Sequence, residues 1–379
     1  MQDKGAPCGF TAPNGFPTLS ATGNTSQKDH IMGAIDSDAH VIESPITWEY
    51  ADEADQQYMP KLVSQTAGPE ERGIHGNVAK EYWLIDNRVH FRDRNLGYDT
   101  TQAAREMQDI DERLAHMDEL EIDMQVLYPT LFLRPYTRKA AVEKAMVKSY
   151  NRWLAEIWKK GNGRLRWVAM ASFMDMNSIR DEIEFAKDNG ACGIFMRGLE
   201  IGRRLTDPYF YPLFELAEEL DLAICHHAGN GSYDVHDTFL DEAGFSKFKL
   251  PVIGTVHSLI LEQLSAKFPK VRWGFIEVSS QWIPYVLNDL SLRFKKTGRE
   301  FSKFILADNN VYVACQVSDD IPHVIAAAGD DNLVIGTDYG HHDTSTEIEA
   351  LRKLKESGDI SEESVNKILF DNAKALYGI

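Results

Sequence analysis

The sequence predicts an α/β protein whose core is a closed barrel of eight parallel strands, a (β/α)8 or TIM barrel. Short apolar runs alternate with stretches of helical spacing along most of the 379 residues. Several of these runs end in a side chain that binds metals, and the carboxyl ends of barrel strands meet at one mouth. A chain of this length fits one such barrel with insertions.

The first strand is expected in the stretch from Ala34 to Glu43, where an apolar approach ends in Asp38 and His40. Residues two apart on a strand face the same side, so this carboxylate and this imidazole are placed to hold one metal ion. Because Asp-x-His also occurs by chance at polar strand ends, the interpretation depends on the strands that follow.

Two segments are expected outside the repeating barrel. Residues 1–30 are rich in Gly, Pro, Ser, Thr and Asn without periodicity, which predicts an N-terminal arm that is disordered or lies along a partner subunit. The region 45–104, which carries several Trp and Tyr residues, is expected to be an insertion over the barrel mouth. The alternative is a surface excursion with its own small core. Residues 31–379 are thus expected to form a single domain.

The strand and helix alternation resumes at about residue 105. Helices are expected near 107–120, 138–160, 176–189, 209–220, 253–268, 282–295 and 319–328. Strands are expected at 123–129, 165–171, 192–196, 222–227, 271–277, 311–315 and 333–338. Each helix joins two neighbouring strands, and right-handed crossovers of this kind give a parallel sheet that closes at eight strands.

Composition excludes several classes of function. The 40 basic and 58 acidic residues give a formal charge of −18, which argues against nucleic acid and anionic membranes as partners. No window approaches the roughly 18 apolar residues of a membrane span, and a signal-peptide core is not apparent. Cys192, Cys225 and Cys315 lie in predicted strands as small buried hydrophobes, so no disulfide framework is indicated. A cytoplasmic protein is expected.

Three later strands end in further metal-binding side chains. They carry His226 with His227, Glu277, and Asp338. No phosphate-binding glycine loop and no Gly-x-Ser-x-Gly elbow occurs, so neither a nucleotide cofactor nor serine-hydrolase chemistry is indicated.

Four motifs follow one another along the sequence: Asp-x-His, His-His-Ala-Gly, Phe-Ile-Glu-x-x-x-x-Trp-Ile-Pro and Gly-Thr-Asp-Tyr-x-His. In this order they resemble the amidohydrolase superfamily, and within it the amidohydrolase-2 branch of metal-dependent decarboxylases and hydrolases. Segments 113–123 and 372–378 support the resemblance, which covers residues 34–379. It implies that the metal ligands are Asp38, His40, His226 and Asp338. Family decarboxylases usually carry His-x-His or Glu-x-His on the first strand and a His near the position of Glu277.

Glu277 is expected to be a general base that accepts a proton from metal-bound water, or a metal ligand itself. His257 is expected at a helix start near the same mouth, where it completes the shell of a second metal or hydrogen-bonds to the backbone. With both residues, the donors suffice for two ions, and carboxylates with imidazoles suit iron or manganese as well as zinc. Glu277, His257 and Asp338 are the candidate catalytic residues.

Four residues are candidates for binding a small-molecule substrate, with carboxylic acids as one class. Arg197 is placed after the fourth strand to bind a carboxylate bidentately or to form a salt bridge in a loop. His227 and His341 adjoin ligand positions and are expected to orient ligands or contact substrate. Trp282 lies near a strand end, where it lines the pocket or packs.

Three functions compete. The first, favoured because Glu277 replaces a His and the donors exceed the needs of one ion, is a dinuclear iron or manganese oxygenase that hydroxylates a small organic acid, as some members of the resembling branch do. The second is a mononuclear zinc or manganese hydrolase or decarboxylase. The third is a non-catalytic subunit of a hetero-oligomer. The arm and the insertion predict a homo-oligomer or an assembly with a homologous subunit.

Overall fold

Eight parallel strands form the central sheet of the computed structural model, which describes residues 33–64, 81–92 and 95–379. In spatial order they are β1 (Ile35–His40), β5 (Met124–Tyr128), β6 (Leu165–Ala169), β7 (Ala191–Arg197), β8 (Ala223–His227), β9 (Trp273–Ile276), β10 (Val311–Cys315) and β11 (Leu333–Ile335). The last strand returns to the first, because Ala39 and Tyr339 form a parallel bridge and the His40 amide donates to the Tyr339 carbonyl at 2.9 Å. The predicted barrel is confirmed.

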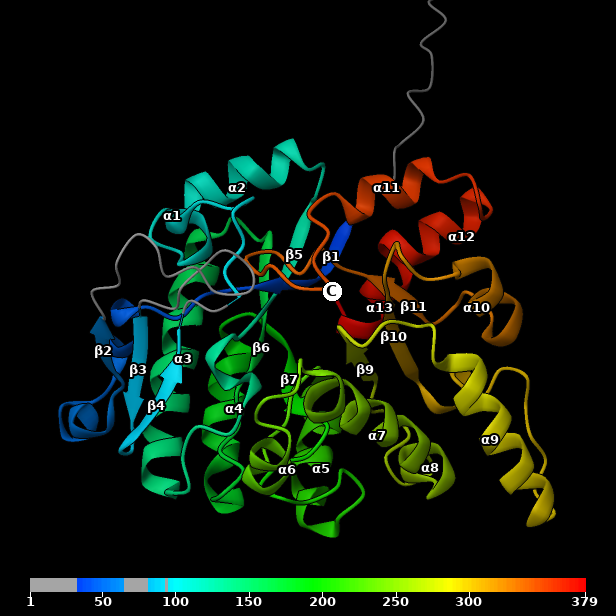
Figure 1. Cartoon of the computed structure of the whole chain (residues 1–379), viewed down its shortest axis with the longest axis horizontal. Coiled ribbons are helices and arrows are strands. Elements are labelled where there is room, and N and C mark those ends of the chain that lie inside the picture. The colour runs from blue at the N-terminus through cyan, green and yellow to red at the C-terminus, as the bar shows by residue number, and fades with distance from the viewer. Residues whose placement is uncertain (1–32, 65–80, 93–94) are drawn as a thin grey trace, which may run out of the picture. The chain divides into compact units, whose positions relative to one another are not determined.

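Helices cover the outside of the strands (Figure 1). Those between strands are α1 (Gln102–Arg105), α2 (Ile110–Glu119), α3 (Ala140–Lys160), α4 (Ile179–Asp188), α5 (Tyr211–Leu220), α6 (Tyr233–Thr238), α7 (Leu250–Leu261), α8 (Leu264–Lys267), α9 (Ile283–Lys296) and α10 (Ile321–Ala328). After the last strand follow α11 (Ala350–Glu356), α12 (Glu362–Asn366) and α13 (Asn372–Tyr377). Short 3-10 turns begin at Met176 and Pro208, directly before α4 and α5.

The core occupies both sides of the strands. Every residue of β7 and β8 is buried, as expected for parallel strands that face helices on one side and the barrel interior on the other. At the amino-terminal end of the barrel, α13 packs against the strands, and Leu376 accepts a hydrogen bond from Arg272 at the start of β9. The Tyr377 hydroxyl reaches inward and donates to the Ser37 carbonyl at 3.0 Å.

The insertion has its own small antiparallel sheet, made of β2 (Lys61–Ser64), β3 (Glu81–Ile85) and β4 (Arg88–Phe91). The hairpin between β3 and β4 turns at Asp86 and Asn87, both with positive φ, as in the two-residue turns that match strand twist. Trp83 faces inward, is 1% exposed, and packs edge-on against Trp48 at a ring distance of 6.0 Å. Trp48, itself part of the insertion, packs in turn against Phe132 of the barrel at a ring distance of 6.3 Å, so buried aromatic residues anchor the insertion to the barrel.

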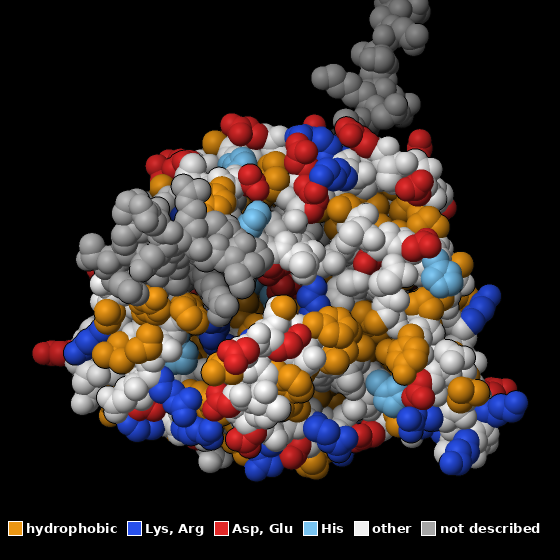
Figure 2. Space-filling model, viewed as in Figure 1, with side chains coloured by type: hydrophobic (Ala, Val, Ile, Leu, Met, Phe, Trp, Pro, Cys, Tyr) orange, Lys and Arg blue, Asp and Glu red, His pale blue; other side chains and the backbone are white. Residues whose placement is uncertain are grey.

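The surface is mixed in charge. On the face that Figure 2 shows, acidic and basic side chains are spread around the periphery, and hydrophobic side chains gather toward the middle. In the described ranges, no helix combines the length and the apolar character that crossing a membrane requires. The predicted N-terminal arm, residues 1–30, lies outside the described residues.

Candidate metal centre

Four buried donors converge where the ends of β1, β8 and β11 meet. The Asp38 carboxylate oxygen Oδ1 lies 3.1 Å from His227 Nε2 and 3.5 Å from His40 Nε2. His40 Nε2 also lies 3.5 Å from Asp338 Oδ1. The most exposed of the four residues, Asp38, is only 4% exposed. The cluster is thus formed by side chains from strands far apart in the sequence, at the carboxyl mouth of the barrel.

The two central imidazoles present lone pairs to the same point. His40 Nδ1 lies 3.0 Å from the Pro129 carbonyl, and His227 Nδ1 lies 3.1 Å from the Ala228 carbonyl. A carbonyl only accepts, so both Nδ1 atoms carry hydrogen, and wherever a ring is neutral its Nε2 lone pair is free for a cation. These Nε2 atoms are 3.0 Å apart, and Asp38 Oδ1 and Asp338 Oδ1 each lie 3.5 Å from His40 Nε2. Such a donor set fits a divalent cation, which would remove the repulsion between the lone pairs.

His341 stands on the other side of His40, with its ring stacked on that of His40 at 3.8 Å. Its Nε2 lies 2.9 Å from the Thr130 hydroxyl, which donates to the Val41 carbonyl at 2.8 Å. The hydroxyl therefore accepts from His341 Nε2, and Nδ1 faces Asp338 Oδ1 at 2.8 Å. His341 thus lies beside the candidate metal donors, where Nδ1 would supply a ligand lone pair or, in the protonated ring, a proton.

Glu277 directly follows β9, and its Oε2 lies 3.1 Å from His227 Nδ1. Glu277, Asp338 and Asp343 form a second group of carboxylates whose oxygens lie within 4.8 Å of one another. Glu277 and Asp338 both have left-handed backbone conformations, with φ of 62° and 53°. Non-glycine residues hold this conformation at a cost, and such positions cluster at functional sites.

Burial controls the ionisation of the centre. Burial lowers the pKa of His40, and the neighbouring His341 lowers it further, so the ring is neutral and its lone pair is available. Burial by itself would raise the pKa of Asp38, but His227 and His40 lower it below its usual range wherever their Nε2 atoms carry a proton. Burial, together with repulsion from Asp343 and Asp38, raises the pKa of Asp338. Burial likewise raises the pKa of Glu277 well above its usual value, with Asp343 next in effect.

The placement of one expected ligand is corrected. His226 points out of the barrel, because neighbouring residues on a strand face opposite sides. Its ring stacks on Phe275 at 5.1 Å, and its Nδ1 lies 3.2 Å from the Arg197 carbonyl. Burial lowers the pKa of His226 to about 4. The β8 residue that faces Asp38 is therefore His227, which the sequence had suggested as a neighbour of the ligand.

Two other expected positions also differ. His257 lies well inside α7, not at a helix start, and its Nε2 binds Asp289 of α9 at 2.8 Å outside the barrel. It is therefore remote from the metal donors. Trp282 donates from Nε1 to the Ser279 carbonyl at 2.6 Å and packs at the start of α9. It does not line the pocket described next.

Arg197 serves the structure of the barrel. It is 4% exposed, and its guanidinium pairs with Glu200 through Nε at 2.9 Å and through Nη2. Its Nη1 donates to the carbonyls of Phe132 and Arg134 at 2.9 and 3.0 Å. The salt-bridge alternative therefore describes Arg197, which ties β7 to the loop after β5.

A pocket opens onto the metal centre at the barrel mouth. It is lined by Phe91, Arg92, Asn95, Leu96, Thr130, Leu133, Arg134, Ala228, Phe248, Glu277, His341 and Asp343. The first four of these belong to the insertion, so this part of residues 45–104 lies at the mouth. Thr130 and Asp343 were not predicted, although Asp343 follows the Asp338 motif closely.

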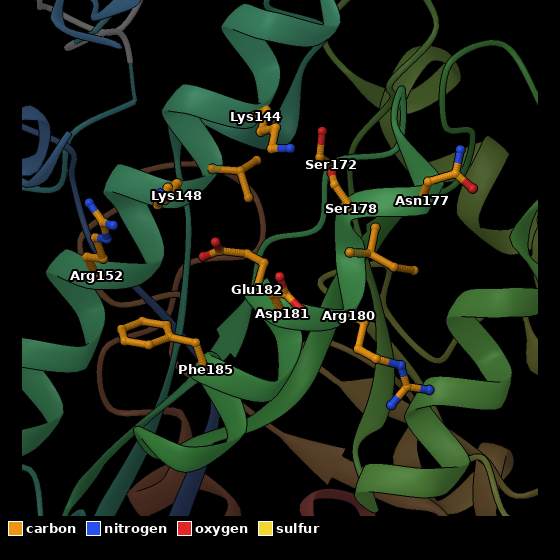
Figure 3. Close-up of a pocket in the computed structure, with 12 residues that line it drawn as sticks. Lys144, Lys148, Arg152, Ser172, Asn177, Ser178, Arg180, Asp181, Glu182 and Phe185 are labelled. Atoms are coloured by element: carbon orange, nitrogen blue, oxygen red, sulfur yellow. The ribbon is translucent and has the colours of Figure 1, made fainter. Parts of the chain in front are cut away.

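A larger cavity of ≈ 420 Å³ lies outside the barrel, between α3 and α4 (Figure 3). Lys144, Lys148 and Arg152 project from α3 toward it. Lys148 and Arg152 are already paired with Asp52 at 2.7 and 2.8 Å. None of the metal donors lines this cavity, so the chemistry belongs to the smaller pocket at the mouth.

A sequence model of the amidohydrolase family, named Amidohydro_2, matches residues 35–379. The chain belongs to this family. No curated protein matches the sequence significantly. The family's barrel and the buried donor cluster together indicate an enzyme that depends on a divalent metal.

Solved structures share the fold. An amidohydrolase from Mycobacterium avium subsp. paratuberculosis has a TM-score of 0.72 and 19% identity, and the match covers 92% of this chain and 100% of that chain. The 5-carboxyvanillate decarboxylase LigW from Sphingomonas paucimobilis has a TM-score of 0.64 and 17% identity over 92% and 99% of the two chains. The 5-carboxyvanillate decarboxylase from Novosphingobium aromaticivorans, complexed with manganese and 4-hydroxy-3-methoxy-5-nitrobenzoic acid, has a TM-score of 0.65 and 17% identity over 93% and 97%.

Proposed function

We propose that this protein is a metal-dependent decarboxylase or hydrolase of a small carboxylic acid. The observation that carries the proposal is the buried cluster of Asp38, His40, His227 and Asp338, with the Glu277 carboxyl beside it. Two structural neighbours are described as decarboxylases, which favours decarboxylation within this pair of reactions.

The four residues of the cluster would hold the ion, which would act as a Lewis acid that polarises an oxygen of the substrate. Glu277 is the group placed to move a proton, since its carboxyl adjoins His227 at 3.1 Å and also faces the pocket. In a decarboxylation, a proton must replace the lost carboxyl group on carbon, and a buried carboxyl that keeps its proton is suited to this step. In a hydrolysis, the ionised form would accept a proton from water.

The pocket favours an aromatic or similarly apolar acid. Phe91, Leu96, Leu133 and Phe248 supply apolar surface, and Arg134 supplies positive charge at the same mouth. The neighbours' substrate, 5-carboxyvanillate, has this character. The pocket is small, with a volume of ≈ 50 Å³, so an aromatic acid fits only if rim side chains such as Phe248 turn aside.

The oxygenase hypothesis, which the sequence favoured, receives less support. Two of its six expected donors, His226 and His257, face away from the centre. One observation remains in its favour. Three overlapping groups of possible metal ligands adjoin one another, because two of them include His40 and two include Asp338, and the last extends to Asp343. Together they offer enough ligands for two ions. The neighbours' names support decarboxylation or hydrolysis instead.

The purified chain should be loaded separately with Zn²⁺, Mn²⁺ and Fe²⁺ and incubated with a panel of aromatic acids under anaerobic conditions. Release of CO₂ or hydrolytic product without oxygen supports the proposal. Product that forms only with O₂ and carries its oxygen atom would identify an oxygenase with iron or manganese. If the metal-loaded chain turns over only after a homologous subunit is added, the non-catalytic subunit hypothesis takes its place, and light scattering tests the expected oligomer.

A further inference from the structure

A buried hydrogen-bonded chain runs behind the metal centre, through Arg113, Gln125, Asp36 and Thr337. These side chains come from α2, β5, β1 and the segment after β11, and all four are 0% exposed. We infer that this chain is a positioning device that sets the separation of the metal ligands on the first and last strands. The inference rests on the metal site proposed above and deepens it.

Asp36 is the centre of the chain. Its Oδ1 accepts from the backbone amides of Thr337 at 2.9 Å and Asp38 at 3.2 Å. Its Oδ2 accepts from the Thr337 hydroxyl at 2.6 Å and from the Gln125 amide at 3.0 Å. Four groups thus converge on the two oxygens of the Asp36 carboxyl group. One carboxylate thus holds the backbone of the ligand Asp38 and of the residue before the ligand Asp338.

Arg113 extends the chain to the other first-strand ligand. Its Nε donates to Gln125 Oε1 at 2.7 Å, and its Nη1 donates to the His40 carbonyl at 3.2 Å. Its guanidinium lies over the ring of Tyr339, 3.5 Å from the ring centre, and Tyr339 directly follows Asp338 in the sequence. The Gln125 amide therefore connects the Arg113 guanidinium to the Asp36 carboxyl group.

The hydrogen-bonded side chains lie at the junction between the first and last strands, and this position explains why they are needed. β11 ends at Ile335, and beyond it the first and last strands share an isolated bridge at Ala39 and Tyr339 and a backbone bond from the Asp338 amide to the Asp38 carbonyl at 2.8 Å, in place of a regular ladder. Three of the four proposed ligands, Asp38, His40 and Asp338, lie along this junction. Where backbone pairing is sparse, directional side-chain hydrogen bonds fix the strand separation and with it the ligand geometry.

The test uses substitutions that nearly preserve the shape of each side chain in this hydrogen-bonded series. Thr337→Val removes the hydroxyl donor, Thr337→Ser keeps it, and Asp36→Asn places an amide where two donors point. Asn372→Ala is the matched control, because Asn372 donates to the Leu333 carbonyl at 2.7 Å and so supports the opposite end of β11. For each folded variant, the Mn²⁺ dissociation constant is measured by calorimetry, and the visible spectrum of the Co²⁺ form reports ligand geometry.

Thr337→Val and Asp36→Asn should raise the Mn²⁺ dissociation constant about 10- to 100-fold and shift the Co²⁺ bands. Thr337→Ser and Asn372→Ala should stay close to wild type in both measurements, even where melting temperature falls. If Thr337→Val binds Mn²⁺ like wild type, the hydrogen-bonded side chains do not position the metal ligands and the inference is wrong. If wild type itself binds no divalent metal, the metal site fails instead. Should Asp36→Asn not fold, the Thr337 pair decides alone.

Discussion

His40 Nε2 and His227 Nε2 lie 3.0 Å apart, although 187 residues separate the two histidines in the sequence. Each ring donates from Nδ1 to a backbone carbonyl, so neither can place a hydrogen between the two Nε2 atoms without becoming charged. A shared cation would resolve the contact. The neighbouring His226 faces away from this point. Alanine variants of His226 and His227 therefore compare an outward-facing and an inward-facing histidine at adjacent positions.

His227→Ala should reduce bound Mn²⁺ or Zn²⁺ to a small fraction of wild type, because it removes a central donor. His226→Ala should retain the metal, although the loss of a fully buried ring that stacks on Phe275 should lower stability by about 2–4 kcal/mol. Metal analysis of the dialysed proteins and urea unfolding distinguish the two. Equal metal loss in both variants would contradict the assignment of His227.

Glu277→Gln should leave most of the metal bound while it slows turnover. The amide preserves the shape of the side chain but cannot act as a general acid or a general base. General acid–base groups contribute roughly 10²–10⁴-fold to rate, so kcat should fall by at least about 10²-fold. Metal content and kcat are measured on the same preparation. Loss of metal in proportion to activity would show that Glu277 is a ligand.

Gly336 lies against the first-strand ligand, and a Cβ there would come within 2.6 Å of the Asp38 nitrogen. Gly336→Ala should therefore cost about 1–3 kcal/mol of unfolding free energy and weaken metal binding, because β1 must move. Gly254→Ala is the control: Gly254 is inside α7, where an added Cβ meets nothing within 4 Å. This control should gain about 0.5–1 kcal/mol and keep its metal affinity.

Glu143 on α3 accepts from the Ser172 hydroxyl at 3.0 Å and from the Met174 amide at 2.7 Å, and burial raises its pKa from 4.5 to about 7. Below pH 4.5, both folded and unfolded chains are protonated at Glu143. As pH rises to about 7, the unfolded chain ionises first, so stability on the order of 3 kcal/mol is lost. Glu143→Gln escapes this loss.

The unfolding free energy of Glu143→Gln, relative to wild type, should therefore increase between pH 4.5 and 7.5. Urea unfolding at several pH values measures it, and titrations elsewhere cancel in the difference. A difference that does not change with pH would show that the folded-state pKa of Glu143 is close to its unfolded value.

Removal of the metal with a chelator should lower the melting temperature, because an ion that binds only the folded chain stabilises it. At a free concentration of 100 times Kd, this stabilisation is about 2.7 kcal/mol. The shift should disappear in His227→Ala and persist in His226→Ala. Differential scanning fluorimetry with and without added Mn²⁺ checks this expectation, and an identical shift in both variants would indicate a metal site elsewhere.

The fold was largely predictable, because the apolar runs and helical stretches mark each barrel element. β10 coincides with the expected strand at 311–315, and α3 begins within two residues of the expected 138. The orientation of His226 and His227 was not predictable in the same way. Every residue of β8 is buried, so the sequence shows no alternation of polar and apolar residues that would tell inside from outside.

Other differences depend on packing between distant segments. His257 was expected at a helix start, but α7 begins at Leu250, so the residue falls on the side that meets Asp289 of α9. Arg197 has a partner three residues later, Glu200, a local pair that could have signalled its structural role. The approach of Asp343 to Glu277 depends on how the loop after β11 folds back, which spacing alone does not determine.

The junction between the first and last strands has a consequence for biosynthesis. Asp36 and Thr337 are 301 residues apart, so the ligands on the two strands come together only after the segment that carries Asp338 has been synthesised. Because contacts of such long range form late and slowly, the growing polypeptide cannot hold the ion in its final geometry. Metal insertion therefore depends on the segment around Asp338, and truncation before this residue should abolish it even where most helices have formed.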